Sequence, residues 1–207
     1  FLPDLIGHLR EAAPGTRIES APWPHEDIAP ALDSGRLDLA IGFLPAVGET
    51  RQRPLLADRY VVLLREGHPF VHRWRRLPVA QRLPALDGLD FAASRTHSDT
   101  LRILQLLRLE SRLRLSAGHL LSLPAIVRRS DLGVLMPRDI ARDFAAQGGL
   151  DILEPAFPLR DFTVSMHWSR RFEADAALAW LRAQVERLFS QPASQAPPHP
   201  SRRGARS

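Results

Sequence analysis

Hydrophobic residues recur every three or four positions in several stretches of the chain, which is the spacing of an amphipathic helix. Helices are predicted on this basis around residues 2–9, 27–34, 101–107, 122–127, 137–147 and 174–189. Pro14 and Gly15 end the first of them, and Asp27 is the expected N-cap of the second. Gly35 follows the second helix and is expected to end it in a left-handed conformation.

Short apolar runs lie between the predicted helices. They predict strands at residues 16–21, 37–43, 60–64, 90–93, 112–116, 133–136, 152–153 and 162–168. The run at 37–43 is apolar at most positions, which is typical of a strand buried on both faces of a parallel sheet. Because helices and apolar strands alternate, the fold class is predicted to be α/β. Residues 71–87 are poorly periodic, and residues 190–207 are predicted to be a disordered tail.

Composition narrows the class of protein. The chain has 207 residues, enough for one or two domains, and carries a net charge of +5. Its basic residues are all arginine and are scattered among acids, which favours a solvated surface over a nucleic-acid-binding face. It contains no Cys, which excludes disulfides and thiolate metal sites and fits a cytoplasmic location. No apolar run is long enough to span a membrane, and the first ten residues lack a signal-peptide pattern.

No pattern in the chain indicates catalysis. It lacks the GxSxG, HExxH and Gly-rich phosphate-loop motifs, and its histidines are not at metal-ligand spacing. Asp87, Asp90 and Asp99 show no pairing of the kind used in general acid–base work. We therefore expect no enzyme activity, no cofactor and no metal.

Several ordered stretches together resemble the effector-binding domain of LysR-type transcriptional regulators. They are Phe1–Leu5, Ala13–Gly15, Ala31–Gly42, Asp58–Pro69 and Ser130–Pro137. The stretches His167–Arg170 and Trp180–Arg182 resemble the branch of the family that senses aromatic acids. The resemblance covers about residues 1–189, and its specificity comes from the order and separation of the stretches.

The resemblance implies two Rossmann-like lobes, as in type 2 periplasmic binding proteins, joined by two crossover strands. Lobe one would comprise residues 1–66 and 166–189, and lobe two residues 67–165. The crossovers would lie near residues 65–68 and 163–168, with a small-molecule inducer in the cleft between the lobes.

The same resemblance implies partners for the chain. They are a homo-oligomer (dimer or tetramer) and, through an N-terminal winged helix-turn-helix absent from this chain, operator DNA. The family's first strand would precede Phe1.

The loop at residues 94–100 holds the first candidate contacts with an effector. It precedes a predicted helix, whose free N–H groups and dipole favour a carboxylate. Thr96, His97 and Ser98 are the candidates in it. The alternative is simple capping of the helix by Ser98 or Asp99.

Four further residues are candidates. Gly118 and His119 form a strand-to-helix turn where the imidazole could donate to an effector oxygen, although a lone loop histidine is often only solvated. Phe43 could form an apolar wall or pack within its lobe. Met166 lies on the returning strand, where alternation places it and His167 on opposite sides, so at most one faces an effector.

Two other functions fit a bilobed α/β chain. A solute-binding protein of a transporter would share the architecture, and an enzyme could use the same cleft for catalysis. The segments His68-Pro69 and Leu132-Gly133-Val134 favour the regulator over the transporter protein.

Overall fold

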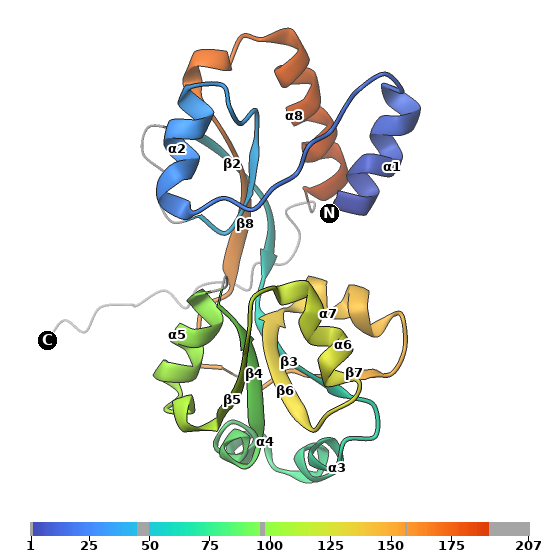
Figure 1. Cartoon of the computed structure of the whole chain (residues 1–207), viewed down its shortest axis with the longest axis vertical. Coiled ribbons are helices and arrows are strands. Elements are labelled where there is room, and N and C mark those ends of the chain that lie inside the picture. The colour runs from blue at the N-terminus through green and yellow to red at the C-terminus, as the bar shows by residue number, and fades with distance from the viewer. Residues whose placement is uncertain (1, 45–49, 96–97, 156, 191–207) are drawn as a thin grey trace, which may run out of the picture. The chain divides into compact units, whose positions relative to one another are not determined.

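The computed structural model describes residues 2–44, 50–95, 98–155 and 157–190, and it divides into two compact units. Unit 1 comprises Phe1–Ala57 and Thr163–Ser207, and unit 2 comprises Asp58–Phe162. The chain therefore enters unit 2 at Asp58 and leaves it after Phe162 (Figure 1). The first of these points comes several residues before the crossover that we expected near residues 65–68.

Unit 2 is built on a five-stranded sheet, sheet B, with the order β5-β4-β6-β3-β7. Its strands are β3 (Tyr60–Arg65), β4 (Asp90–Ser94), β5 (Leu113–Ala117), β6 (Leu132–Pro137) and β7 (Leu150–Leu153). Strand β4 runs parallel to β5 and β6, whereas β3 is antiparallel to β6 and β7. The core strands are apolar on both faces, as a sheet covered on both sides requires.

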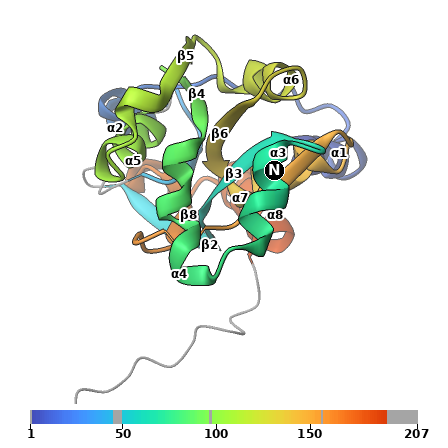
Figure 2. The same cartoon turned by 90° about the horizontal axis from the view of Figure 1, so that it is seen from below.

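Helices cover both faces of sheet B (Figures 1 and 2). On one face lie α3 (Pro69–Arg76), η1 (Pro84–Gly88) and α5 (Ser98–Leu106), whose buried side chains pack on Val62, Phe91 and Leu135. The other face carries η3 (Leu120–Ser122), α6 (Leu123–Val127) and α7 (Arg138–Ala145). Two short elements, α4 (Val79–Arg82) and η2 (Glu110–Arg112), complete the unit. The result is a three-layer α/β/α arrangement.

Unit 1 contains the smaller sheet, sheet A, with the order β1-β8-β2. These strands are β1 (Ala40–Gly42), β8 (Phe162–Trp168) and β2 (Arg51–Asp58), and β1 is antiparallel to β8. Its helices are α1 (Leu2–Ala12), α2 (His25–Asp33), η4 (Arg170–Phe172) and α8 (Ala176–Phe189).

The two faces of sheet A are covered by different helices. Ile28 and Leu32 of α2 pack with Ala40 on one face, and Val185 of α8 packs with Leu55 and Met166 on the other. His167 is paired with Ala40 across the strands, so it shares the α2 face, because directly paired residues point to the same side. The predicted opposition of Met166 and His167 is therefore confirmed.

Two strand predictions need correction, and one strand was missed. Residues 16–21 form no regular strand, because Pro22 and Pro24 follow and no neighbouring strand pairs with the segment among the described residues. The strand predicted at 37–43 is only Ala40–Gly42, and it is antiparallel to β8 rather than part of a parallel sheet. Strand β2 was not predicted, because its first four residues are exposed and polar or proline.

Two helix predictions also need correction. Helix α2 begins at His25 after Pro24 and has no side-chain cap, so Asp27 lies in its first turn instead of capping it. Residues 71–87 are not irregular, since Phe70, Val71 and Trp74 form the buried face of the basic helix α3. Gly35 has φ of 72° and ends α2 in the left-handed conformation that we expected.

Candidate functional site

The strands β4, β5 and β6 end at the same edge of sheet B. Ser94, the last residue of β4, is paired with Ala117, the last of β5. Strand β6 is parallel to β4 and ends at Pro137, which pairs with Tyr60 at the start of the antiparallel β3. We call this the carboxyl edge of sheet B. Ligands in open α/β sheets bind beyond such an edge, which makes it the candidate site of unit 2.

Some of the predicted contact residues lie at this edge. Gly118 and His119 follow β5 directly, and the exposed His119 precedes η3. The structure places Ser98 as the first residue of α5, one turn after β4. Thr96 and His97 lie outside the described residues, as does the side chain of Ser98. The carboxyl edge therefore brings the turn at 118–119 and the start of α5 to the same side of the sheet.

Asp58 is a buried carboxylate at this edge, with only 4% of its surface exposed. Its Oδ1 accepts the backbone N–H of Arg59 at 2.7 Å and of Arg138 at 3.2 Å, and its Oδ2 accepts that of Asp139 at 3.3 Å. Asp58 thus caps α7 from 80 residues away in sequence. Burial raises the pKa of Asp58, while the three N–H donors oppose that rise.

Tyr60 connects the start of β3 to the start of α5. Its hydroxyl donates to the Asp99 carboxylate, and its ring lies 5.2 Å from that of Phe162, centroid to centroid. Burial, together with the negative charges of Asp99 and Asp58, raises the pKa of Tyr60 well above its usual value. The hydroxyl therefore stays protonated and keeps a fixed hydrogen bond at the carboxyl edge.

Arg138, the first residue of α7, is the third polar residue at the carboxyl edge, after Asp58 and Tyr60. Its backbone N–H is bound by Asp58, but its side chain has neither a hydrogen bond nor an ion pair with the described residues, and its Nε is buried. Several other arginines of unit 2 have acid partners; for example, Arg59 lies 3.2 Å from Asp161, measured from Nη2 to Oδ2.

Two predicted contact residues belong to unit 1. Phe43 follows β1 and is 41% exposed, which is compatible with an apolar contact surface. Met166 is 1% exposed and packs between Leu55 and Val185. Its side chain therefore fills the core of unit 1, because strand alternation points it at α8, and it offers no surface to a ligand.

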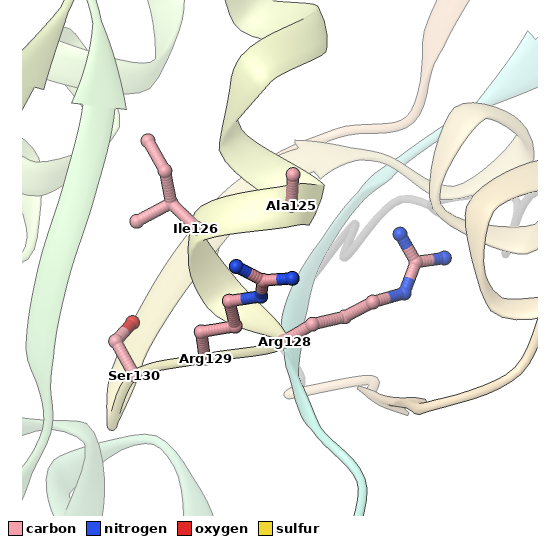
Figure 3. Close-up of a pocket in the computed structure, with 5 residues that line it drawn as sticks. All are labelled: Ala125, Ile126, Arg128, Arg129 and Ser130. Carbon is pink, nitrogen blue, oxygen red and sulfur yellow. The ribbon is translucent and has the colours of Figure 1, made fainter.

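A different place on unit 2 carries a depression of about 710 Å³ that is open to solvent. Its lining comes from Ala125, Ile126, Arg128, Arg129 and Ser130 (Figure 3). Ser130 precedes β6, so the depression lies at the opposite edge of sheet B from the candidate site. Arg128 donates from Nε to the Gly148 carbonyl (3.1 Å) and from Nη2 to that of Phe144 (3.0 Å), which ties it to the end of α7. Size alone therefore does not mark this surface as the site.

The described part of the chain has neither a metal-ligating cluster nor a membrane-spanning helix. No three or more His, Asp or Glu side chains in it are grouped so that they could hold a metal ion. Within the same residues, every helix is too short or too polar to cross a bilayer.

Comparison with known families decides the class of protein. The sequence profile described as the LysR substrate binding domain matches residues 1–190. The chain belongs to the LysR substrate-binding domain family. This LysR domain has the type 2 periplasmic-binding-like fold that the resemblance implied, and membership of the LysR family disfavours the transporter alternative.

Curated relatives of the LysR domain are transcriptional regulators. It is 26% identical over 193 residues to the HTH-type transcriptional activator NagR of Ralstonia sp., covering 92% of this chain and 63% of the relative. It is 28% identical over 192 residues to the HTH-type transcriptional activator NahR of Pseudomonas putida, with the same coverage of 92% and 63%. The chain thus spans less than two thirds of the length of these relatives.

Solved structures show the same fold. A putative transcriptional regulator from Vibrio parahaemolyticus superposes with a TM-score of 0.73 at 23% identity, covering 90% of this chain and 87% of that one. The regulatory domain of MexT, a transcriptional activator in Pseudomonas aeruginosa, superposes with a TM-score of 0.69 at 19% identity, covering 91% and 92%.

The sequence analysis did not single out Asp58, Tyr60, Asp99 or Arg138 as members of the carboxyl edge. Asp58 and Tyr60 were noted only as part of a stretch that resembles the family. The contacts between Asp58 and Arg138 and between Tyr60 and Asp99 join distant segments, so no local spacing could reveal them. A polar residue directly before a buried strand, as in Asp58-Arg59-Tyr60, was the one available signal.

Proposed function

We propose that this LysR domain senses a small carboxylate-bearing molecule, and that the effector contacts the carboxyl edge of sheet B. The single observation that carries the proposal is the convergence of β4, β5 and β6 on one edge, where α5 and α7 begin. Membership of the LysR family supplies the effector-sensing role. The turn at Gly118 and His119 and the loop at residues 94–100 are the proposed contacts.

The chemical class of effector is also part of the proposal. The stretches His167–Arg170 and Trp180–Arg182 resemble the branch of the family that senses aromatic acids. The exposed ring of Phe43 offers an apolar surface in unit 1. An aromatic carboxylate is therefore the proposed effector, and Phe43 is a separate candidate contact on unit 1.

Further parts of the proposal concern the whole protein. We propose that it is a cytoplasmic transcription regulator without catalytic activity, that it assembles as a homo-oligomer, and that it binds operator DNA through a helix-turn-helix outside this chain. The curated regulators that it resembles support this role. An effector would act by binding one conformation of the regulator more tightly than another, which shifts the population between them.

Calorimetry against a panel of aromatic carboxylates tests the proposal. We expect saturable binding of at least one of them, with His119→Ala weakening the affinity about tenfold through a lost hydrogen bond. His72→Ala is the matched control, because His72 is exposed on α3 and away from the carboxyl edge. Binding that is absent across the panel, or lost equally in both variants, would refute the proposal.

A further inference from the structure

Arg138 has a side-chain environment unlike that of its neighbours. It is half-buried, its Nε has no contact with solvent, and its side chain makes no hydrogen bond or ion pair with the described residues. Buried charged groups are almost always paired, because an unpaired charge loses its hydration without compensation. Only Nε of this half-buried guanidinium is recorded as buried, and that nitrogen lacks the acceptor that a buried donor normally has.

Nearby carboxylates do not supply that partner. Asp58 binds the backbone N–H of Arg138 rather than its side chain. Asp139 lies 4.0 Å from Arg142, measured between Oδ1 and Nη1, and Asp161 pairs with Arg59. Asp58, Asp139 and Asp161 thus have partners other than the Arg138 guanidinium.

The position of Arg138 on its helix points it toward the candidate site. Residues 138, 141 and 145 share one face of α7 at helical spacing, and Ala141 on that face is fully buried. Side chains in a helix lean toward its N-terminus, which for α7 lies at the carboxyl edge of sheet B. The stem of Arg138 therefore packs inward while its guanidinium lies at that edge.

We infer that Arg138 binds the carboxylate of the effector and sets the preference of this domain for anionic over neutral ligands. The inference rests on the proposed function and adds the residue that recognises the charge. A guanidinium suits this task, because its two parallel N–H groups match the two oxygens of a carboxylate. The effector would supply an acceptor to the guanidinium, whose Nε has no contact with solvent.

Benzoate and benzamide are matched probes, because they differ in charge but hardly in shape. With the full 207-residue chain, we expect benzoate to bind at least tenfold more tightly than benzamide. Arg138→Met keeps an unbranched apolar stem and removes the charge, so it should weaken benzoate binding at least tenfold and leave benzamide binding unchanged. Arg142→Met, on the exposed side of the same helix, should alter neither affinity.

A second measurement separates this role from a structural one. Without ligand, Arg138→Met should unfold at the same or a higher denaturant concentration than the wild type, because it removes an unpaired, half-buried charge. A lower midpoint would mean that Arg138 pairs with an acid of the protein itself, and would overturn the inference.

The binding results test the role of Arg138 and the proposed ligand class separately. If Arg138→Met binds benzoate as tightly as the wild type does, the inference about Arg138 fails while the proposed function stands. If neither probe nor any other aromatic carboxylate binds the wild type, the proposed ligand class fails and the inference fails with it.

Discussion

Asp58 in unit 2 and His167 in unit 1 are both polar and almost fully buried, yet their surroundings are opposite. Asp58 accepts three backbone N–H groups and holds the start of α7 in place. His167 is 1% exposed, and neither of its ring nitrogens has a hydrogen-bond partner among the described residues. Burial disfavours the charged form of both groups, but for Asp58 three N–H donors partly replace the lost water, whereas for His167 no described residue does.

The difference also separates their responses to pH. Burial lowers the pKa of His167, since the imidazolium would lose its hydration without gaining a partner. Burial raises the pKa of Asp58, and its three N–H donors partly offset that rise. In unit 2 the buried Asp58 holds the backbone at the carboxyl edge of sheet B, whereas in unit 1 burial favours the neutral form of His167.

The largest expected effect comes from removing the carboxylate of Asp58. Asp58→Ala removes a shared acceptor of three backbone N–H groups, of which only that of Arg138 keeps another acceptor, the Arg59 carbonyl, and it should lower the free energy of unfolding by about 2 kcal/mol. Asp58→Asn, which keeps Oδ1, should lose less. Urea unfolding measures both, with the exposed Asp143→Ala on the same helix as the control. An equal loss in Asp143→Ala would show that Asp58 has no special role.

The next effect is the pH dependence due to His167. Because its folded pKa is lowered, the unfolded chain binds more protons below the usual value of 6.5, so stability is lost as the pH falls. The slope for one proton is at most about 1.4 kcal/mol per pH unit. His167→Leu should remove this component when urea unfolding is compared at pH 7.5 and below 6.5. A variant with the unchanged wild-type slope would assign the dependence to other groups.

Thr100 provides an intermediate case, since it is buried and its Oγ1 donates to the Leu135 carbonyl at the long distance of 3.4 Å. Thr100→Val keeps the shape and loses only this weak bond, so the expected loss is less than about 1 kcal/mol. Thr100→Ser keeps the hydroxyl and loses the methyl group. If thermal unfolding shows Val to be much more destabilising than Ser, the hydroxyl matters more than its geometry indicates.

The smallest effect belongs to an exposed ion pair. Arg59 and Asp161 are about half exposed and 3.2 Å apart, from Nη2 to Oδ2, so solvent screens their attraction. A double-mutant cycle with Arg59→Ala and Asp161→Ala should give a coupling of about 0.5 kcal/mol or less. A coupling as large as the loss in Asp58→Ala would remove the distinction between buried and exposed charges that the comparison makes.

Periodicity in the sequence predicted the elements whose cores are strongly apolar. Strand β6 and helices α7 and α8 match the predictions within a few residues, because the hydrophobic face of each packs directly in the core of its own unit. Strand β2 was missed, because the exposed Arg51, Gln52, Arg53 and Pro54 carry no strand pattern and only pairing in sheet A orders them.

The candidate site was less predictable than the fold. The turn at Gly118 and His119 could be placed because it follows a recognisable strand. Alternation predicts that Met166 and His167 point to opposite sides but not which of them faces the core, and the structure places Met166 in the core of unit 1. Asp58 and Arg138 meet only after β3 and β6 pair, so their relation is a property of the folded sheet.

Amide hydrogen exchange of the whole chain with and without benzoate tests the central claim most directly. The account predicts slower exchange at the carboxyl edge of sheet B, in residues 94–100, at Gly118 and His119, and at the start of α7. Slower exchange confined to the opposite edge, around Arg129 and Ser130, would contradict the proposed site.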